Sequence, residues 1–502
     1  MLVTEARPRN LRWFHAGPLL YGDWGTSRLY VLGLAFFFTA HASIVYLALI
    51  GVLMIAVSWA YTVVCRCFPD GGGVYTAARR LHPVLSVVGA TLLLCGYIIT
   101  AAISAVEAAH YVGVPEEWTF GFSGVVIVLL GMVNYFGARS AGRLALVIAF
   151  AALAVSGVLA IGVVFLTPFF WNGVREITLA GLFDDPWEAW VNFTSICLAL
   201  AGVEAVANMT GLMRPPVART SRRTIWPVSA EVVGLNVVFG IALTGLAITT
   251  VGGRAMVDIK TPDADRQAAA QAAFLEKLPE DLRAEAGTGE GIRLGAEALA
   301  GLPPALAAEY ESLRRYGREV DEYKNAAMKV IARDAATHVT GNATAGLVFG
   351  KAAGVTFGLL LLSATNTVIM AMVSVLFAMA QDRELPRPLT RLNYSGVPWV
   401  GLIVAVLAPI AVLALERDVA RLAELYVIGV CGAITTNILC CAVNRSLDIS
   451  RGERAGMWGL GLFLLAITLT IAGTKANAAL FAGGVVGLAL ATRGGLRLAA
   501  RG

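Results

Sequence analysis

The sequence predicts an all-α polytopic membrane protein with about twelve transmembrane helices. Of its 502 residues, 57% are hydrophobic and the mean hydropathy is +0.72, whereas soluble domains contain about 45–50% apolar residues. Charged residues make up only 15% of the chain. Long uncharged runs, such as 84–105, 397–415 and 458–474, are of the length that crosses roughly 30 Å of hydrocarbon. A soluble protein would have to bury all of these runs, so we reject that alternative.

Twelve apolar segments follow one another along the chain. In order, they cover 18–41, 42–64, 84–111, 120–137, 144–167, 190–212, 225–250, 346–380, 396–414, 420–443, 456–473 and 476–492. Helices 1–7 are therefore expected within 18–252 and helices 8–12 within 343–492. Residues 1–17 and 493–502 are expected to be tails.

Charge predicts the orientation of these segments. If the N-terminus lies in the cytosol, the loops on that side carry most of the arginines, and the opposite loops carry acids such as Glu116 and Asp184. This agrees with the positive-inside rule, so we expect both termini in the cytosol and the protein in the inner (plasma) membrane. The N-terminal tail contains arginines but no short apolar core with a cleavage site, and it is not expected to be a signal peptide.

The spans divide into two sets of five, 18–167 and 190–443, and each set opens with an acid beside glycine. Because five is odd, the second set runs through the membrane in the opposite sense. This predicts a 5+5 inverted repeat in which helices 1 and 6 are broken, with a solute site where they meet. Helices 11 and 12 lie outside the repeat.

A polar stretch at 253–342 separates spans seven and eight and is too charged to enter lipid. Its Ala, Glu, Leu and Arg content predicts helices, and Leu306, Tyr310, Leu313 and Val320 form a narrow apolar stripe. By parity, this insert is extracytoplasmic. We expect a small helical cap; dimerisation and contact with a partner protein are the alternatives.

The first candidate site residue is Asp23, an acid in the first apolar segment. A charge in the membrane interior is costly and is rarely without function. Gly22 and Gly25 permit a helix break, and Thr26 and Ser27 are suited to restart a helix. The first half-helix would end in unpaired carbonyls beside the carboxylate, which suits a dehydrated cation and repels an anion. The alternative is that Asp23 caps the restarted helix and contacts no solute.

The second buried acid, Glu204, follows Gly202 in the sixth segment, where we expect the second break. A carboxyl group that gains a proton on one side of the membrane and releases it on the other can act as a proton carrier. A structural hydrogen bond to a neighbouring helix is the alternative.

Neutral oxygen atoms are available nearby. Thr100 and Ser104 are four residues apart and share one helix face, Tyr30 follows Asp23 by one or two turns, and Tyr426 begins the tenth segment. The alternative role of such hydroxyls is a hydrogen bond to the carbonyl four residues earlier.

Other chemistry is not indicated. The seven cysteines and five histidines show no metal-ligand spacing, and no nucleophile–base pair or phosphate-binding loop is visible. We therefore expect no enzyme activity, no catalytic residues, no cofactor and no metal other than a transported cation. The net charge of +5 is explained by the cytosolic arginines, so no nucleic-acid partner is expected.

Several motifs carry a family resemblance. Residues 21–32, Tyr-Gly-Asp-Trp-Gly-Thr-Ser-Arg-Leu-Tyr-Val-Leu, resemble the opening motif of KUP potassium importers, with Trp24 and Arg28 as departures. Segments 68–75, 96–104, 201–216, 364–386 and 425–430 are similar to KimA. The chain thus resembles the amino acid–polyamine–organocation superfamily, and within it the proton-coupled potassium importers.

The resemblance implies a LeuT-like fold, a homodimer, and rocking of spans one, two, six and seven against the others. By position, the cation ligands of the family fall on Asp23, Tyr30, Thr100, Ser104 and Tyr426. A threonine of the family's second break is replaced here by Ala201, which removes one possible ligand.

The leading hypothesis is a symporter in the lipid bilayer that imports potassium ions together with protons, with Glu204 as the proton site. One alternative is an amino acid or amine permease of the same superfamily, although Asp23 opposes a substrate carboxylate. The other is a membrane receptor or sensor that does not transport and uses the 253–342 insert to bind a partner.

Overall fold

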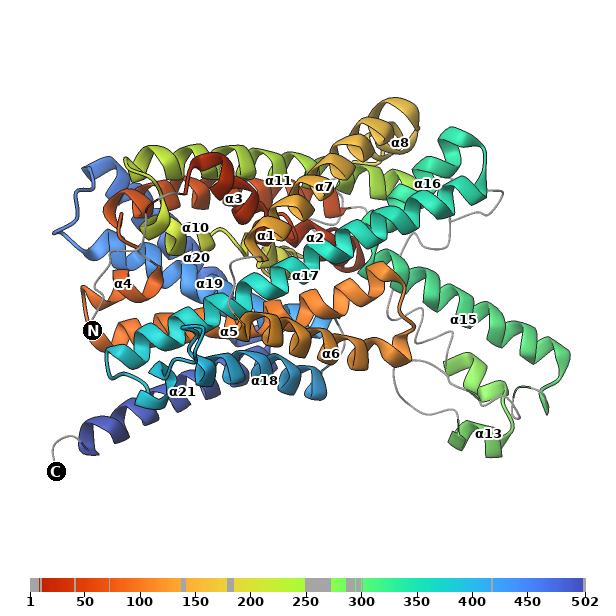
Figure 1. Cartoon of the computed structure of the whole chain (residues 1–502). Helices are drawn as coiled ribbons and strands as arrows, with labels where there is room; N and C mark the ends of the chain where they lie inside the picture. Colours follow the sequence, from red (N-terminus) through yellow and green to blue (C-terminus); the bar gives the residue numbers. More distant parts are fainter. Residues whose placement is uncertain are drawn as a thin grey trace.

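The structure, a computed structural model, describes residues 9, 11–39, 42–71, 73–136, 141–177, 185–248, 272–285, 294, 299, 301–416 and 419–499. Within these ranges the chain is helical, and its long helices form one elongated bundle (Figure 1). Among the described residues, ten helices are long and apolar enough to cross a membrane. These observations confirm the prediction of an all-α polytopic membrane protein.

The unbroken helices lie close to the predicted segments. They are α3 (Ser43–Cys67), α5 (Pro83–Val112), α6 (Glu116–Tyr135), α7 (Ala141–Ile161, continued by η2, Gly162–Leu166), α11 (Val217–Ile248), α17 (Ala343–Gln381), α18 (Trp399–Leu415), α19 (Val419–Val443), α20 (Arg451–Thr474) and α21 (Ala476–Ala499). The last helix continues seven residues beyond the predicted end at 492, and Arg493 in this extension forms a buried ion pair with Glu384 (2.5 Å).

Local sequence signals explain where several helices begin and end. Pro83 occupies the first turn of α5, where its missing N–H is no loss, and Gly113 ends this helix with a φ of +88°. Ser450 and Glu453 form a capping box at the start of α20, in which each side chain accepts the backbone N–H of the other residue.

Two helices are interrupted. The first consists of α1 (Trp13–Trp24) and α2 (Ser27–Thr39), separated by Gly25 and Thr26. The second consists of α9 (Pro186–Ile196) and η3 (Cys197–Leu200), a turn at 201–204, and then α10 (Ala205–Met209) and η4 (Thr210–Leu212). The breaks lie in the two segments where glycine beside an acid predicted them.

The insert contains α13 (Glu280–Glu285), α15 (Pro304–Asn325) and α16 (Ala327–Thr340). Leu306, Tyr310 and Leu313 of the predicted stripe pack in a small separate core that includes Phe274 and Leu278, so this stripe packs on its own chain. The side chain of Val320 lies outside the described residues. In Figure 1, α13 and α15 extend from the end of the bundle opposite to α4 (Val74–Arg79) and α21.

Candidate functional site

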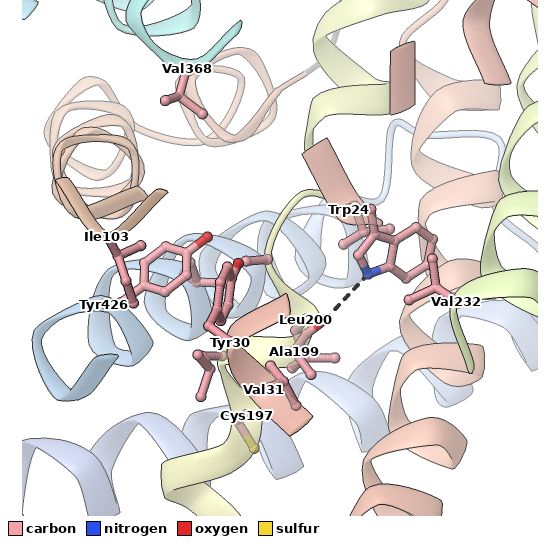
Figure 2. Close-up of a cluster of buried hydrophobic side chains, with 14 of the residues drawn as sticks. Trp24, Tyr30, Val31, Ile103, Cys197, Ala199, Leu200, Val232, Val368 and Tyr426 are labelled. Atoms are coloured by element: carbon pink, nitrogen blue, oxygen red, sulfur yellow. Dashed lines mark hydrogen bonds between the residues drawn. The ribbon is translucent and has the colours of Figure 1, made fainter. Parts of the chain in front are cut away.

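The two helix breaks are in direct contact. Gly202 has a φ of +100°, and a Cβ atom on it would lie 2.7 Å from both the N and the Cα of Trp24. The indole N–H of Trp24 donates a hydrogen bond to the carbonyl of Ala199 at 3.3 Å (Figure 2). Only glycine fits this junction, since it combines a left-handed φ with a close backbone approach.

The sequence analysis predicted unpaired carbonyls at the end of α1, but two of these carbonyls accept hydrogen bonds. The Thr26 hydroxyl donates to the Asp23 carbonyl at 2.5 Å, and the Ser27 hydroxyl donates to the Trp24 carbonyl at 2.7 Å. Both hydroxyls lie at the restart of the helix and turn back toward α1. Each carbonyl oxygen keeps a second lone pair, so these atoms can still face a cation.

The glycines of the first break have different surroundings. Gly22 lies inside α1, and a Cβ atom there would meet no atom within 4 Å. Gly25 lies at the break itself, and a Cβ atom there would lie 2.6 Å from the ring of Tyr21.

Asp23 and Glu204 lie on the two sides of this junction, and both are buried, with exposures of 6% and 7%. Asp23 is in the last turn of α1, and Glu204 directly precedes α10. One Glu204 carboxylate oxygen accepts the backbone N–H of Gly202 at 3.0 Å. The two carboxyl groups interact electrostatically, so the site places two titratable acids between the two half-helices.

Two tyrosines bring neutral oxygens to the same region. The rings of Tyr30 and Tyr426 pack edge to face, with centroids 6.5 Å apart, and Figure 2 shows their hydroxyls side by side. The two hydroxyls interact with each other, and both tyrosines interact electrostatically with Asp23 and Glu204. Side-chain oxygen atoms that could bind a cation are thus contributed by α1, α2 and α19 to the region of the two helix breaks.

The predicted residues of α5 are also buried, although less tightly joined to the acids. Thr100 donates its hydroxyl to the Gly96 carbonyl at 2.8 Å, as the structural alternative predicted, and it also interacts with Tyr426. Ser104 is fully buried, and among the described residues its hydroxyl has no hydrogen-bond partner. A buried hydroxyl without a partner is uncommon in folded proteins, and it leaves an oxygen atom available for a ligand.

Three further charged residues near the site were not identified from the sequence. Arg28, only 1% exposed, donates to both carboxylate oxygens of Glu231 at 2.6 and 2.7 Å and lies over the ring of Tyr21. Glu107 is fully buried on α5 and interacts electrostatically with Tyr30. Two sequence signals could have identified two of them. Arg28 departs from the KUP opening motif, and Glu107 lies seven residues after Thr100 on the same helix face.

An all-α bundle in which two interrupted helices meet at buried acids is characteristic of membrane transport proteins. A family model described as amino acid permease matches residues 328–487. A probable potassium transport system protein Kup from Bordetella avium is 30% identical over 228 residues, and one from Pseudomonas putida is 28% identical over 244 residues.

Each Kup match covers 40% of this chain, and the chain spans about 36% of the length of each of these relatives. The matches confirm the predicted resemblance to this superfamily and to the KUP-type proteins. They are to transport proteins and not to enzymes.

Proposed function

We propose that this protein is a secondary active transporter that imports potassium ions coupled to protons by alternating access. The central observation is the junction of the two helix breaks, where Asp23 and Glu204 interact electrostatically with Tyr30 and Tyr426. A potassium ion enters a protein by exchanging its hydration shell for oxygen ligands. Carboxylate and hydroxyl oxygens from several helices supply such ligands.

In this proposal Asp23 holds the cation and Glu204 carries the proton. Thr100 and Ser104 add neutral oxygens from α5, the latter through its unpartnered hydroxyl. Glu204 is suited to the proton because it belongs to the turn that leads into α10, a half-helix that alternating access would move. A carboxyl group in such a position can meet each side of the membrane in turn.

The hydrogen bond between Glu204 and Gly202 argues against an amino acid as substrate. Permeases of this superfamily hold the substrate carboxylate on exposed backbone N–H groups at the breaks. Here the Gly202 N–H already binds a carboxylate of the protein itself, and Asp23 would repel a second one.

The alternative function is an amino acid or amine permease of the same superfamily, and the amino acid permease match favours it; Asp23 is compatible with a cationic amine. That match begins at residue 328, so it includes neither Asp23 nor Glu204. Competition of unlabelled polyamines and amino acids with potassium uptake separates the two substrates.

The remaining assignments also belong to this proposal. The arginine distribution supports cytosolic termini, an inner-membrane location and an extracytoplasmic insert. The position of α13 and α15 at the end of the bundle opposite to α4 is consistent with this orientation (Figure 1). The LeuT-like inverted repeat and the homodimer stay predictions from the sequence pattern and the family resemblance.

The test is transport in liposomes containing the purified protein, with potassium flux and internal pH followed together. We expect potassium-dependent proton movement. Asp23→Asn should raise the potassium concentration for half-maximal uptake roughly 10- to 100-fold, because it weakens a charged contact of about 1.5–3 kcal/mol. Asp448→Asn, at an exposed position, is the matched control. Wild-type protein that moves polyamines but no potassium would refute the proposal.

A further inference from the structure

We propose that Tyr97 is the positioning residue of a cytosolic latch, which holds the second half of the interrupted helix against α5 and closes the cytosolic route to the site. This inference rests on the proposed transport function, since a latch has a purpose only where alternating access occurs. It adds a residue that neither the sequence motifs nor the central site had indicated.

The latch begins with one hydrogen bond between two helices. The side-chain amide of Asn208 on α10 donates to the Tyr97 hydroxyl on α5 at 2.9 Å. Tyr97 is buried, whereas Asn208 is exposed. The bond therefore lies between the buried site and solvent, and it joins α10 to a helix outside the interrupted pair.

Two further contacts, from the chain that precedes α4, hold α10 and the residues that follow it. A Cβ atom on Gly73, in the loop before α4, would lie 2.2 Å from the Asn208 side-chain oxygen. The Thr210 hydroxyl, in the turn after α10, donates to the Phe68 carbonyl at 2.9 Å. Phe68 and Gly73 therefore lie directly against α10 and η4.

The N-terminal segment holds the same end from a further direction. The Leu11 N–H donates to the Leu212 carbonyl at 3.0 Å, and the Arg214 N–H donates to the Leu11 carbonyl at 2.9 Å. Residues 205–214 are thus held by α5, by residues 68 and 73, and by residue 11. Opening this end requires all three contacts to separate, and of these the Tyr97 hydrogen bond involves a residue that interacts electrostatically with the buried acids.

Glu204 connects the latch to the site. It directly precedes α10, so a movement of this half-helix away from α5 also moves the acid. Tyr97 interacts electrostatically with Glu204 and with Asp23. Tyr97 thus lies where the half-helix, the buried acids and the cytosolic closure meet.

A second tyrosine provides a matched control. Tyr61 on α3 is buried, interacts with Glu204, and accepts a hydrogen bond from Asn437 at 3.5 Å. Asn437 belongs to α19, however, so this bond does not involve α10. Tyr61→Phe removes a hydroxyl of the same kind, near the same acid, without affecting the latch.

The experiment is hydrogen–deuterium exchange of the full-length protein in lipid nanodiscs, comparing wild type, Tyr97→Phe and Tyr61→Phe. We expect Tyr97→Phe to accelerate exchange in 205–214 and 68–76 about fivefold, the effect of losing roughly one net hydrogen bond. Exchange in 323–335 at the opposite end should be unchanged, and Tyr61→Phe should leave 205–214 at the wild-type rate. A merely structural role would accelerate exchange in all of these segments.

Unchanged exchange in 205–214, or equal acceleration in 323–335, would overturn the inference. If Tyr97→Phe fails to fold, Asn208→Ala removes the donor at an exposed position and carries the same expectation. The exchange measurement requires no transport, so it can support the latch even if the liposome experiment fails to show potassium flux. In that case only the proposed substrate is refuted.

Discussion

Replacing Gly202 with alanine tests whether the contact between the two helix breaks is essential. The added Cβ would lie 2.7 Å from the N and Cα of Trp24 and 3.0 Å from the carbonyl carbon of Asp23. Ordinary contacts begin at 3.4 Å, so the breaks would have to separate by about 0.7 Å, because the obstructing atoms are backbone. The φ of +100° adds about 1–3 kcal/mol of strain for a residue with a side chain.

Both effects act on the site. A displacement of this size moves Asp23 away from Glu204, and a misplacement of about 1 Å can reduce function roughly 100-fold. We therefore expect Gly202→Ala to reduce potassium uptake in liposomes by about two orders of magnitude. It should also lower the apparent melting temperature in detergent, as measured by intrinsic tryptophan fluorescence.

Gly22→Ala is the control, because it adds the same methyl group one residue before Asp23. Its Cβ would meet no atom within 4 Å, and alanine in a helix interior is favoured over glycine by about 0.5–1 kcal/mol. Transport should be retained and the melting temperature unchanged or raised. Full transport by Gly202→Ala would show that the breaks can separate without loss and would refute the assigned junction.

Two further predictions concern charges. Glu231→Gln should lower the apparent free energy of unfolding by about 3–5 kcal/mol, because it leaves a buried arginine without its partner; denaturation in detergent measures this, and a loss below 1 kcal/mol would contradict it. In the insert, burial alone would raise the pKa of Glu322, but Arg333 and Lys329 outweigh this and hold the pKa below its ordinary value. Such a carboxyl group contributes stability above its unfolded pKa of about 4.3 and loses it as the pH falls through the folded pKa. The protection factors of the amides in 322–335, which compare each exchange rate with the intrinsic rate at the same pH, should therefore fall on acidification below about pH 4.3. Glu322→Gln, made with Asp334 kept as in the wild type, should weaken this dependence.

The sequence predicted the helices well because a bilayer requires long apolar segments with internally satisfied backbones. The interruptions were predictable for a similar reason, since glycine beside a buried acid has few other uses. The detail at the break was not. Whether Thr26 caps the following helix or turns back to the Asp23 carbonyl depends on backbone angles that composition does not encode.

Long-range pairs were equally out of reach of the sequence. Glu231 lies 203 residues from Arg28, and nothing local indicates that these two residues meet. The ion pair of Asp382 with Arg79 likewise became known only from the packing of α4. A single sequence predicts which charges are costly to bury and leaves open how each cost is offset.

The departure at Arg28 bears on the proposed cation site. By Coulomb's law, a free guanidinium placed for illustration at about 10 Å from a potassium ion opposes binding by roughly 1.7 kcal/mol at an effective dielectric constant near 20, which corresponds to more than tenfold in affinity. Both carboxylate oxygens of Glu231 accept hydrogen bonds from this guanidinium, and the negative charge of Glu231 offsets most of the electrostatic field of Arg28. The Arg28 side chain also lies over Tyr21 and donates to the Gly25 carbonyl. The arginine therefore stabilises the break while its charge is compensated, and a basic residue five positions after Asp23 remains compatible with a cation as substrate.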